Sequence, residues 1–201
     1  MVSGFLISPK DHDLIRSGEA TTLPASSVDN ANTQGADQGI EARTLRLNAD
    51  TLTNTRGAIR TNADATIVSA GIVDNTAGLI SAMGALRISD PKAGTATAKA
   101  LDIVNTDGTL AAGERLLLDA AGFSGDGTVV SDKELAIALS KNVVNNGAVS
   151  AAGTLSYVTT GTFTNNSKLH ATQTLSGGGA DVLNNVGAEM SAGRKTVVTA
   201  S

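Results

Sequence analysis

Carboxylates are the side chains of this sequence with the widest capacity for catalysis. Most of them are expected at turns: Asp64, Asp74, Asp90, Asp102, Asp107, Glu114, Asp119, Asp132, Glu134 and Glu189. Hydrolysis of glycosidic bonds needs two carboxylates at a defined separation. Asp107 and Asp126 are spaced to stack as neighbours, but each precedes a glycine, and Asp is common in such turns because its side chain bonds the turn backbone. A turn role is favoured over a carbohydrate-active enzyme, and no catalytic residue is predicted.

The other reactive groups form no metal or cofactor motif. His12 and His170 are the only histidines and lie far apart in the sequence, and there is no cysteine. Residues 176–183 resemble one nonapeptide of a calcium-binding β-roll, but such sites need tandem copies and the sequence has one. No phosphate-binding loop, zinc spacing or nucleophile elbow occurs. We therefore predict neither a metal nor a cofactor.

Asparagines recur at separations of about 20 residues or close to a multiple of 20, once an insertion is allowed, which indicates one stacked structural unit. They are Asn54, Asn75, Asn105, Asn145, Asn165 and Asn185. An apolar residue precedes each by two positions, and Phe123 fills this position in the unit where Gly125 replaces asparagine. This apolar row is Leu52, Val73, Ile103, Phe123, Val143, Phe163 and Leu183.

Two further apolar rows follow the same repeat. One begins each unit as Leu45/Leu47, Ala65/Ile67, Leu86/Ile88, Leu116/Leu118, Leu135/Ile137 and Leu155/Tyr157. The other is Ile59, Ile80, Leu110, Leu169 and Met190, with Val129 or Val130 and then Val149 near the remaining places. Apolar residues alternate with polar ones at period two, which is strand spacing, and glycines and asparagines separate the short strands.

The expected fold is an all-β, right-handed parallel β-helix with about 20 residues and three short strands per coil. Pairs of helices are excluded, because no unit has room for two helices of about ten residues each. A buried asparagine at the same turn of each coil can donate to one neighbouring coil and accept from the other. The asparagine row is thus predicted to form a ladder, with each rung contributing about 1 kcal/mol.

The repeat suggests one elongated domain. Residues 1–39 are expected to form an irregular entry segment, within which Val28, Asn30 and Gly35 imitate a degenerate coil. Residues 40–201 are expected to form the β-helix, with an inserted loop near 90–99. Insertions in solenoids often carry binding, so Pro91, Lys92 and Lys99 are candidate contact residues. A neutral insertion is nevertheless the favoured interpretation.

Composition narrows the function classes. The net charge is −4 and aromatics make up 2% of the residues, without the basic and aromatic stripe that nucleic acid binding requires. No apolar run approaches the roughly 18 residues of a membrane-spanning helix, and residues 1–10 lack the basic segment of a signal peptide. We therefore expect no nucleic acid partner and no membrane span.

Three segments resemble the filamentous haemagglutinin repeat: residues 45–59 (LRLNADTLTNTRGAI), residues 75–84 (NTAGLISAMG) and residues 155–165 (LSYVTTGTFTN). Residues 75–84 match the N-x-x-G-x-I-x-A-x-G stretch of that family. The resemblance covers about residues 40–201. Repetition in register makes it specific although each unit is degenerate.

The resemblance implies a segment of a large exoprotein of Gram-negative bacteria, exported by a two-partner outer-membrane transporter and displayed at the cell surface. Members include adhesins, which act in virulence, and contact-dependent growth inhibition effectors. The favoured function is a structural stalk that stacks on further coils of a longer chain and projects a distal binding or toxin region. The alternative is a direct adhesion module for a host or target-cell glycan or receptor. A stalk should have a coat of small polar residues, whereas a glycan binder should expose aromatics or an arginine-rich groove.

Overall fold

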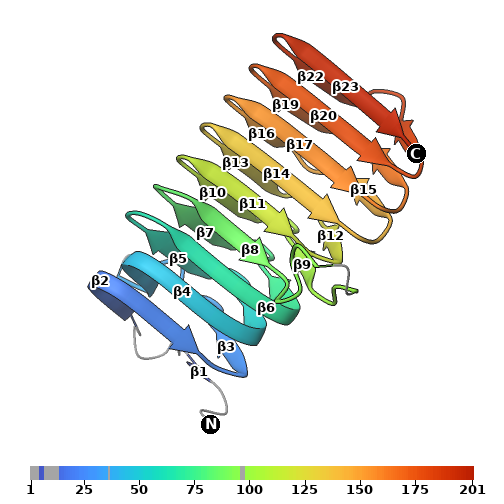
Figure 1. The fold of residues 1–201 in the computed structure, drawn as a ribbon. Coiled ribbons are helices and arrows are strands. Elements are labelled where there is room, and N and C mark those ends of the chain that lie inside the picture. The colour runs from blue at the N-terminus through green and yellow to red at the C-terminus, as the bar shows by residue number, and fades with distance from the viewer. Residues whose placement is uncertain (1–4, 7–13, 36, 96–97) are drawn as a thin grey trace.

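The computed structural model describes residues 5–6, 14–35, 37–95 and 98–201. These residues form 23 β-strands and no helix. Parallel strands stack into a β-solenoid of about nine turns with roughly 21 residues per turn (Figure 1). This confirms the all-β parallel β-helix expected from the sequence. Most turns contribute one strand to each of three faces.

Three long strands bend around the solenoid and supply more than one face. They are β2 (Leu14–Pro24), β4 (Gly39–Thr53) and β6 (Ala65–Asp74). Face 1 continues through β5 (Ala58–Thr61), β7 (Leu79–Ala82), β10 (Thr109–Ala112), β13 (Thr128–Ser131), β16 (Val149–Ala151), β19 (Lys168–Ala171) and β22 (Glu189–Ala192). Face 2 continues through β8 (Leu86–Ser89), β11 (Arg115–Asp119), β14 (Glu134–Leu139), β17 (Thr154–Thr159), β20 (Thr174–Gly179) and β23 (Lys195–Ala200). Face 3 contains β1 (Phe5–Leu6), β3 (Ser27–Asp29), β9 (Asp102–Val104), β12 (Gly122–Ser124), β15 (Val143–Asn145), β18 (Phe163–Asn165) and β21 (Val182–Asn184).

The core is built from the three apolar rows because successive side chains of a strand point to opposite sides of the wall. On face 3 the buried row is Val28, Leu52, Val73, Ile103, Phe123, Val143 and Phe163. The face 2 pairs from Leu45/Leu47 to Leu155/Tyr157 are buried as predicted. On face 1, Val129 and Val149 continue the row of Ile59 and Ile80, which settles the choice against Val130.

The last turn departs from the predicted core. Leu183 is 51% exposed, and Val182 takes the place beside Phe163. The reason is turn length: three residues separate β17 from β18, whereas two residues separate β20 from β21. Losing one residue moves each following side chain to the other side of the strand. The prediction that Leu183 belongs to the core row is therefore wrong.

The solenoid begins before residue 40. β2 runs parallel to β4 along faces 1 and 2, and β3 pairs with the end of β4 on face 3. Val28 is buried, so the segment that imitates a degenerate coil is a packed turn. The other residues expected in the entry segment, 1–4 and 7–13, lie outside the described residues.

Candidate functional site

Buried asparagines form the most extensive polar feature of the described residues. The side-chain amide of each donates to the side-chain carbonyl of the next: Asn30 to Asn54 at 2.7 Å, Asn54 to Asn75 at 2.7 Å and Asn75 to Asn105 at 2.8 Å. The same amide groups also donate to turn carbonyls, such as Asn54 to Leu79 at 3.1 Å. The ladder predicted from the sequence is confirmed for these rungs. It also includes Asn30. The sequence indicated this rung through the apolar residue Val28 two positions earlier, and Val28 is buried in the structure.

The ladder is interrupted in the turn that contains Gly125. Asn105 donates to the carbonyl of Thr128 at 3.2 Å instead of to another asparagine. On the far side of the gap, the buried Oδ1 of Asn145 finds no hydrogen-bond partner among the described residues. The row of amides therefore consists of two segments that share one polarity, with donors directed toward the C-terminal end.

The second ladder segment ends at a different residue from the one predicted. Asn145 donates to Asn165 at 2.8 Å, and Asn165 donates to Asn184 at 2.8 Å. Asn185 lies outside, where it donates to Asn166 at 2.6 Å as part of an exposed row with Asn146. The assignment of Asn185 to the buried ladder is wrong for the same reason as that of Leu183, because the shortened turn shifts both residues by one position.

A column of glycines follows the ladder at the next corner. In five of them an added Cβ would lie 2.1–2.2 Å from a backbone carbonyl oxygen of the preceding turn. They are Gly57, Gly78, Gly108, Gly127 and Gly147. No side chain fits this space, which explains the glycines through close contact between turns. Gly187, three residues after the ladder residue Asn184, has open space around it and a φ of 84°.

The inserted loop is anchored by Asp90. Its carboxylate accepts hydrogen bonds from the amides of Lys92 at 2.7 Å, Ala100 at 2.6 Å and Leu101 at 2.9 Å, so both ends of the loop meet at one buried side chain. Burial raises the pKa of Asp90, but these amide hydrogen bonds outweigh burial and hold the pKa below its ordinary value. The sequence signal for this anchor was an Asp before Pro, a common start of a turn.

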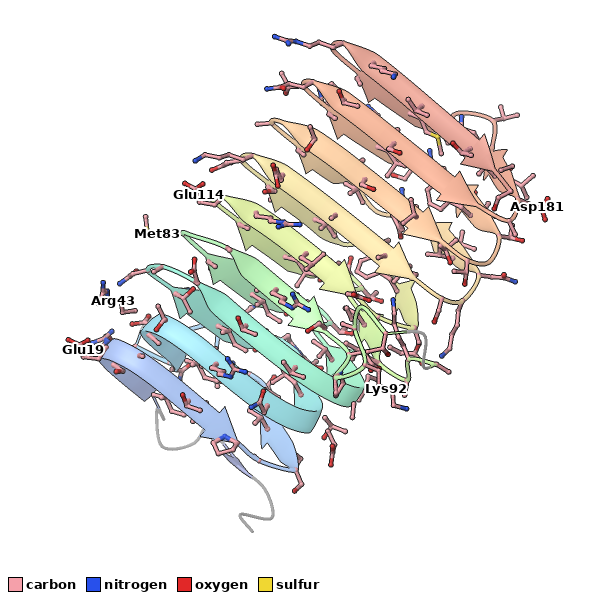
Figure 2. The ribbon with its side chains drawn as sticks, viewed as in Figure 1. Glu19, Arg43, Met83, Lys92, Glu114 and Asp181 are labelled. Atoms are coloured by element: carbon pink, nitrogen blue, oxygen red, sulfur yellow. The ribbon has the colours of Figure 1, made fainter. Side chains whose placement is uncertain are left out.

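Two of the three candidate contact residues of the loop are exposed, and one is not. Lys99 forms an ion pair with Asp119 and approaches the carbonyl of Ala138 at 3.3 Å, and its side chain is 14% exposed. It therefore ties three successive turns together. Pro91 and Lys92 are exposed. The ammonium of Lys92, which is labelled in Figure 2, donates to the carbonyl of Ala98 within the same loop at 3.3 Å.

Several of the carboxylates at the corners make structural contacts. Asp126 accepts from the backbone amide of Asp107 at 3.0 Å, so these two residues do stack, through a turn contact. Glu114 pairs with Lys133 at 2.5 Å, and Asp102 pairs with Lys141 at 2.8 Å across two turns. The described residues contain no cluster of three potential metal-binding side chains.

A hollow lined by charged side chains lies on face 1. It is about 330 Å³ in volume and is lined by Arg16, Glu41 and Arg60 among others. Hydrogen bonds to Glu41 and Asp37 raise the pKa of Arg16, and Arg60 lies 3.8 Å from Glu41. Because the cations in this hollow are neutralised by neighbouring carboxylates, it offers no surplus charge to a ligand.

Tyr157 is fully buried and its ring packs on Phe163 with centroids 4.8 Å apart. Gly177 of the next turn leaves space beside these rings. The Tyr157 hydroxyl finds no hydrogen-bond partner among the described residues, and burial raises its pKa well above the ordinary value. His170 is outward-facing and contacts Ser191 at 2.9 Å.

These features define a parallel β-solenoid whose polar groups serve mainly to join one turn to the next. No protein-family model, curated protein or solved structure matches the chain. Among the described residues there is also no helix of the length and hydropathy that crossing a membrane would require.

Proposed function

We propose that this chain is a structural stalk segment of a large, secreted, filamentous-haemagglutinin-like exoprotein. In this proposal the segment holds a distal adhesive or growth-inhibiting region away from the surface of a Gram-negative cell. The single observation that carries the proposal is the use of polar side chains. The buried amides and several of the charged pairs connect one turn to another. Such contacts oppose separation of the turns when the rod is pulled along its axis.

The surface supports the same function. Several charged side chains of the outer walls are paired across neighbouring turns, as in Arg16 with Glu41 at 2.9 Å and Lys133 with Glu114 at 2.5 Å. The aromatic side chains Phe123, Tyr157 and Phe163 are buried. A glycan-binding groove would instead present aromatic faces.

Export by a two-partner outer-membrane transporter belongs to the same proposal. A solenoid stabilised by nearest-neighbour stacking can fold turn by turn as it emerges from a pore. The chain contains no cysteine, so oxidation cannot trap wrong pairings on the way.

Surface display tests the stalk. The chain would be placed between an outer-membrane anchor and a distal epitope, and binding of an antibody to intact cells would be measured. Because each turn adds about 4.8 Å of reach, removing whole turns should reduce epitope access stepwise on cells with a thick surface polysaccharide. Access should be unchanged on cells without that polysaccharide, which controls for expression and folding.

Direct adhesion is the alternative that this experiment must exclude. The purified chain alone should not bind target cells or a glycan panel. If it does bind, and if deletion of residues 92–98 abolishes the binding while strand content persists, the loop is an adhesive site and the stalk proposal fails. Lys99 is retained in that deletion because it holds Asp119.

A further inference from the structure

One Asn-Gly dipeptide occurs in the sequence, at Asn146 and Gly147. An asparagine before a glycine is the arrangement in which a backbone amide most readily attacks a side-chain amide, because glycine has no Cβ to crowd the approach of its nitrogen. The dipeptide lies at the corner between β15 and β16, and Asn146 is exposed. Water therefore reaches the side chain at which the reaction would occur.

The backbone amide of Gly147 has no hydrogen-bond acceptor among the described residues. The amides at the same position in the turns on either side are engaged. Gly127 donates to the carbonyl of Asn105 at 2.8 Å, and Ser167 donates to Oδ1 of Asn165 at 3.3 Å. An amide that already has an acceptor must lose that bond before its nitrogen can attack. Of the three, the amide of Gly147 is the most available as a nucleophile.

The side-chain carbonyl of Asn146 is polarised by the next turn. Asn166 occupies the same corner position there, and its side-chain amide donates to Oδ1 of Asn146 at 2.8 Å. Attack on Cγ of Asn146 places negative charge on this oxygen. A donor that is already in place stabilises that charge as it develops.

We propose that Asn146 is a site of spontaneous deamidation in the folded chain. The nitrogen of Gly147 loses its proton and forms a bond to Cγ of Asn146, the bond from Cγ to Nδ2 breaks, and ammonia leaves behind a cyclic succinimide. Water then adds to one of the two ring carbonyls, and the ring opens to a carboxylate. Addition at Cγ gives aspartate, and addition at the main-chain carbonyl gives isoaspartate. The reaction consumes only water and does not depend on the stalk function.

The two products differ in how they fit the solenoid. Aspartate preserves the backbone, and its carboxylate keeps the hydrogen bond from Asn166. Isoaspartate routes the main chain through the former side chain, which adds a carbon atom to it. Gly147 is packed so closely on the preceding turn that an added Cβ would lie 2.2 Å from the carbonyl oxygen of Gly127. The longer backbone therefore strains this corner, directly after the ladder residue Asn145.

Incubation of the purified full chain at mildly alkaline pH in water enriched in heavy oxygen tests the proposal. Tandem mass spectrometry of peptides prepared in ordinary water should place the heavy oxygen at residue 146, and an isoaspartyl methyltransferase should label the same peptide. Asn166 is the matched control within the molecule, since it is also exposed at this corner but is followed by Ser167. Its deamidation should be at least about tenfold slower.

Two outcomes of that incubation would overturn the proposal. One is deamidation at Asn146 that is no faster than at Asn166. The other is deamidation at Asn146 that occurs only when the chain is unfolded in urea, since the folded corner would then protect the dipeptide.

Substitution tests the contribution of the neighbouring turn. Asn166→Ala should slow deamidation of Asn146 about three- to tenfold, because the donor to Oδ1 is lost. Asn62→Ala, on the exposed wall far along the chain, should leave the rate unchanged. Equal rates in the two variants would contradict the role of Asn166.

Thermal melts test the difference between the products. The Asn146→Asp variant should melt with the unmodified chain, whereas the isoaspartate form, separated by chromatography, should melt at a lower temperature. An isoaspartate form as stable as Asn146→Asp would show that the corner accommodates the longer backbone.

Discussion

Individual polar residues in this solenoid differ in how completely they are satisfied, and these differences predict their energetic roles. Asn75 uses both ends of its amide, since it accepts from Asn54 and donates to Asn105. Within the part of the chain that the structure describes, Asn145 donates but its Oδ1 has no partner, and the buried hydroxyl of Tyr157 has none either. A buried polar group without a hydrogen bond costs about 1–3 kcal/mol, so residues of one type should respond differently to substitution.

Replacing Tyr157 by Phe should stabilise the protein by about 1 kcal/mol, because the variant buries no unpaired hydroxyl. Urea denaturation at neutral pH would measure this gain, and Tyr157→Leu, which leaves a cavity, should lose stability. Burial raises the pKa of Tyr157 in the folded state. The unfolding free energy should therefore be constant below the unfolded pKa of about 10 and fall as the pH rises above it, because the phenol ionises more readily in the unfolded chain. The Phe variant should lack this alkaline loss. A lower stability of Tyr157→Phe at neutral pH would show that the hydroxyl is bonded.

Replacing Asn75 by Ala should destabilise the protein by about 1–3 kcal/mol, because Asn54 and Asn105 would each lose a buried partner. Asn145→Ala should cost less, since one end of that amide is already unpaired. Asn62→Ala on the exposed wall serves as the control. Equal losses of unfolding free energy for Asn75→Ala and Asn62→Ala would contradict the ladder.

Structural elements are held by contacts between turns more than by the propensity of any strand. The glycine column at one corner lets the turns approach, and the Asp90 anchor returns the inserted loop to the wall beside the point where it left. Lys99 contacts a later turn and Lys141 contacts an earlier turn. Both contacts lie close to the turn where the ladder is interrupted. These two ion pairs therefore reinforce the part of the stack that lacks an asparagine rung.

Replacing Gly78 by Ala should destabilise the protein by about 1–3 kcal/mol, because the new Cβ would lie 2.2 Å from the carbonyl oxygen of Asn54 and the two turns would have to separate. Gly18→Ala is the matched control, since it has open space and no positive φ. Thermal melts followed by circular dichroism would compare the two. If both variants melt together, the glycine column does not set the distance between turns.

The whole molecule is a stack in which each turn contacts its neighbours, so its stability should be close to a sum over turn interfaces. Its parallel register extends from β2 to β23, and N- and C-terminal turns lie at opposite ends (Figure 1). Such an architecture can change length by whole turns without a change in its cross-section.

Removing residues 134–153 should leave a folded solenoid one turn shorter. Glu134 and Thr154 occupy the same position in adjacent turns, so the new junction keeps every row in register. Removing residues 134–143 should unfold at least the neighbouring turns, because it deletes β14 and joins the corner after face 1 directly to face 3. Circular dichroism and small-angle scattering would distinguish the two. A whole-turn deletion as damaging as the half-turn deletion would rule out independent stacking units.

The amino-acid sequence by itself determined the repeat, the three rows of Leu52, Ile59 and Leu45 and their equivalents, and most of the asparagine ladder. It could do so because alternation along a strand and recurrence between turns are both written into residue order. The family resemblance and the stalk function remain proposals.

The tertiary structure alone decided which residue occupies a row where a turn changes length. Val182 and Asn184 replace the predicted Leu183 and Asn185, since a shift of one residue reverses the side of the strand. It also decided that Lys99 is tied to Asp119 and that the glycines of the corner column are required by backbone carbonyls of the preceding turn. Such contacts depend on which turn lies next in space, and that is known only once the chain has been stacked.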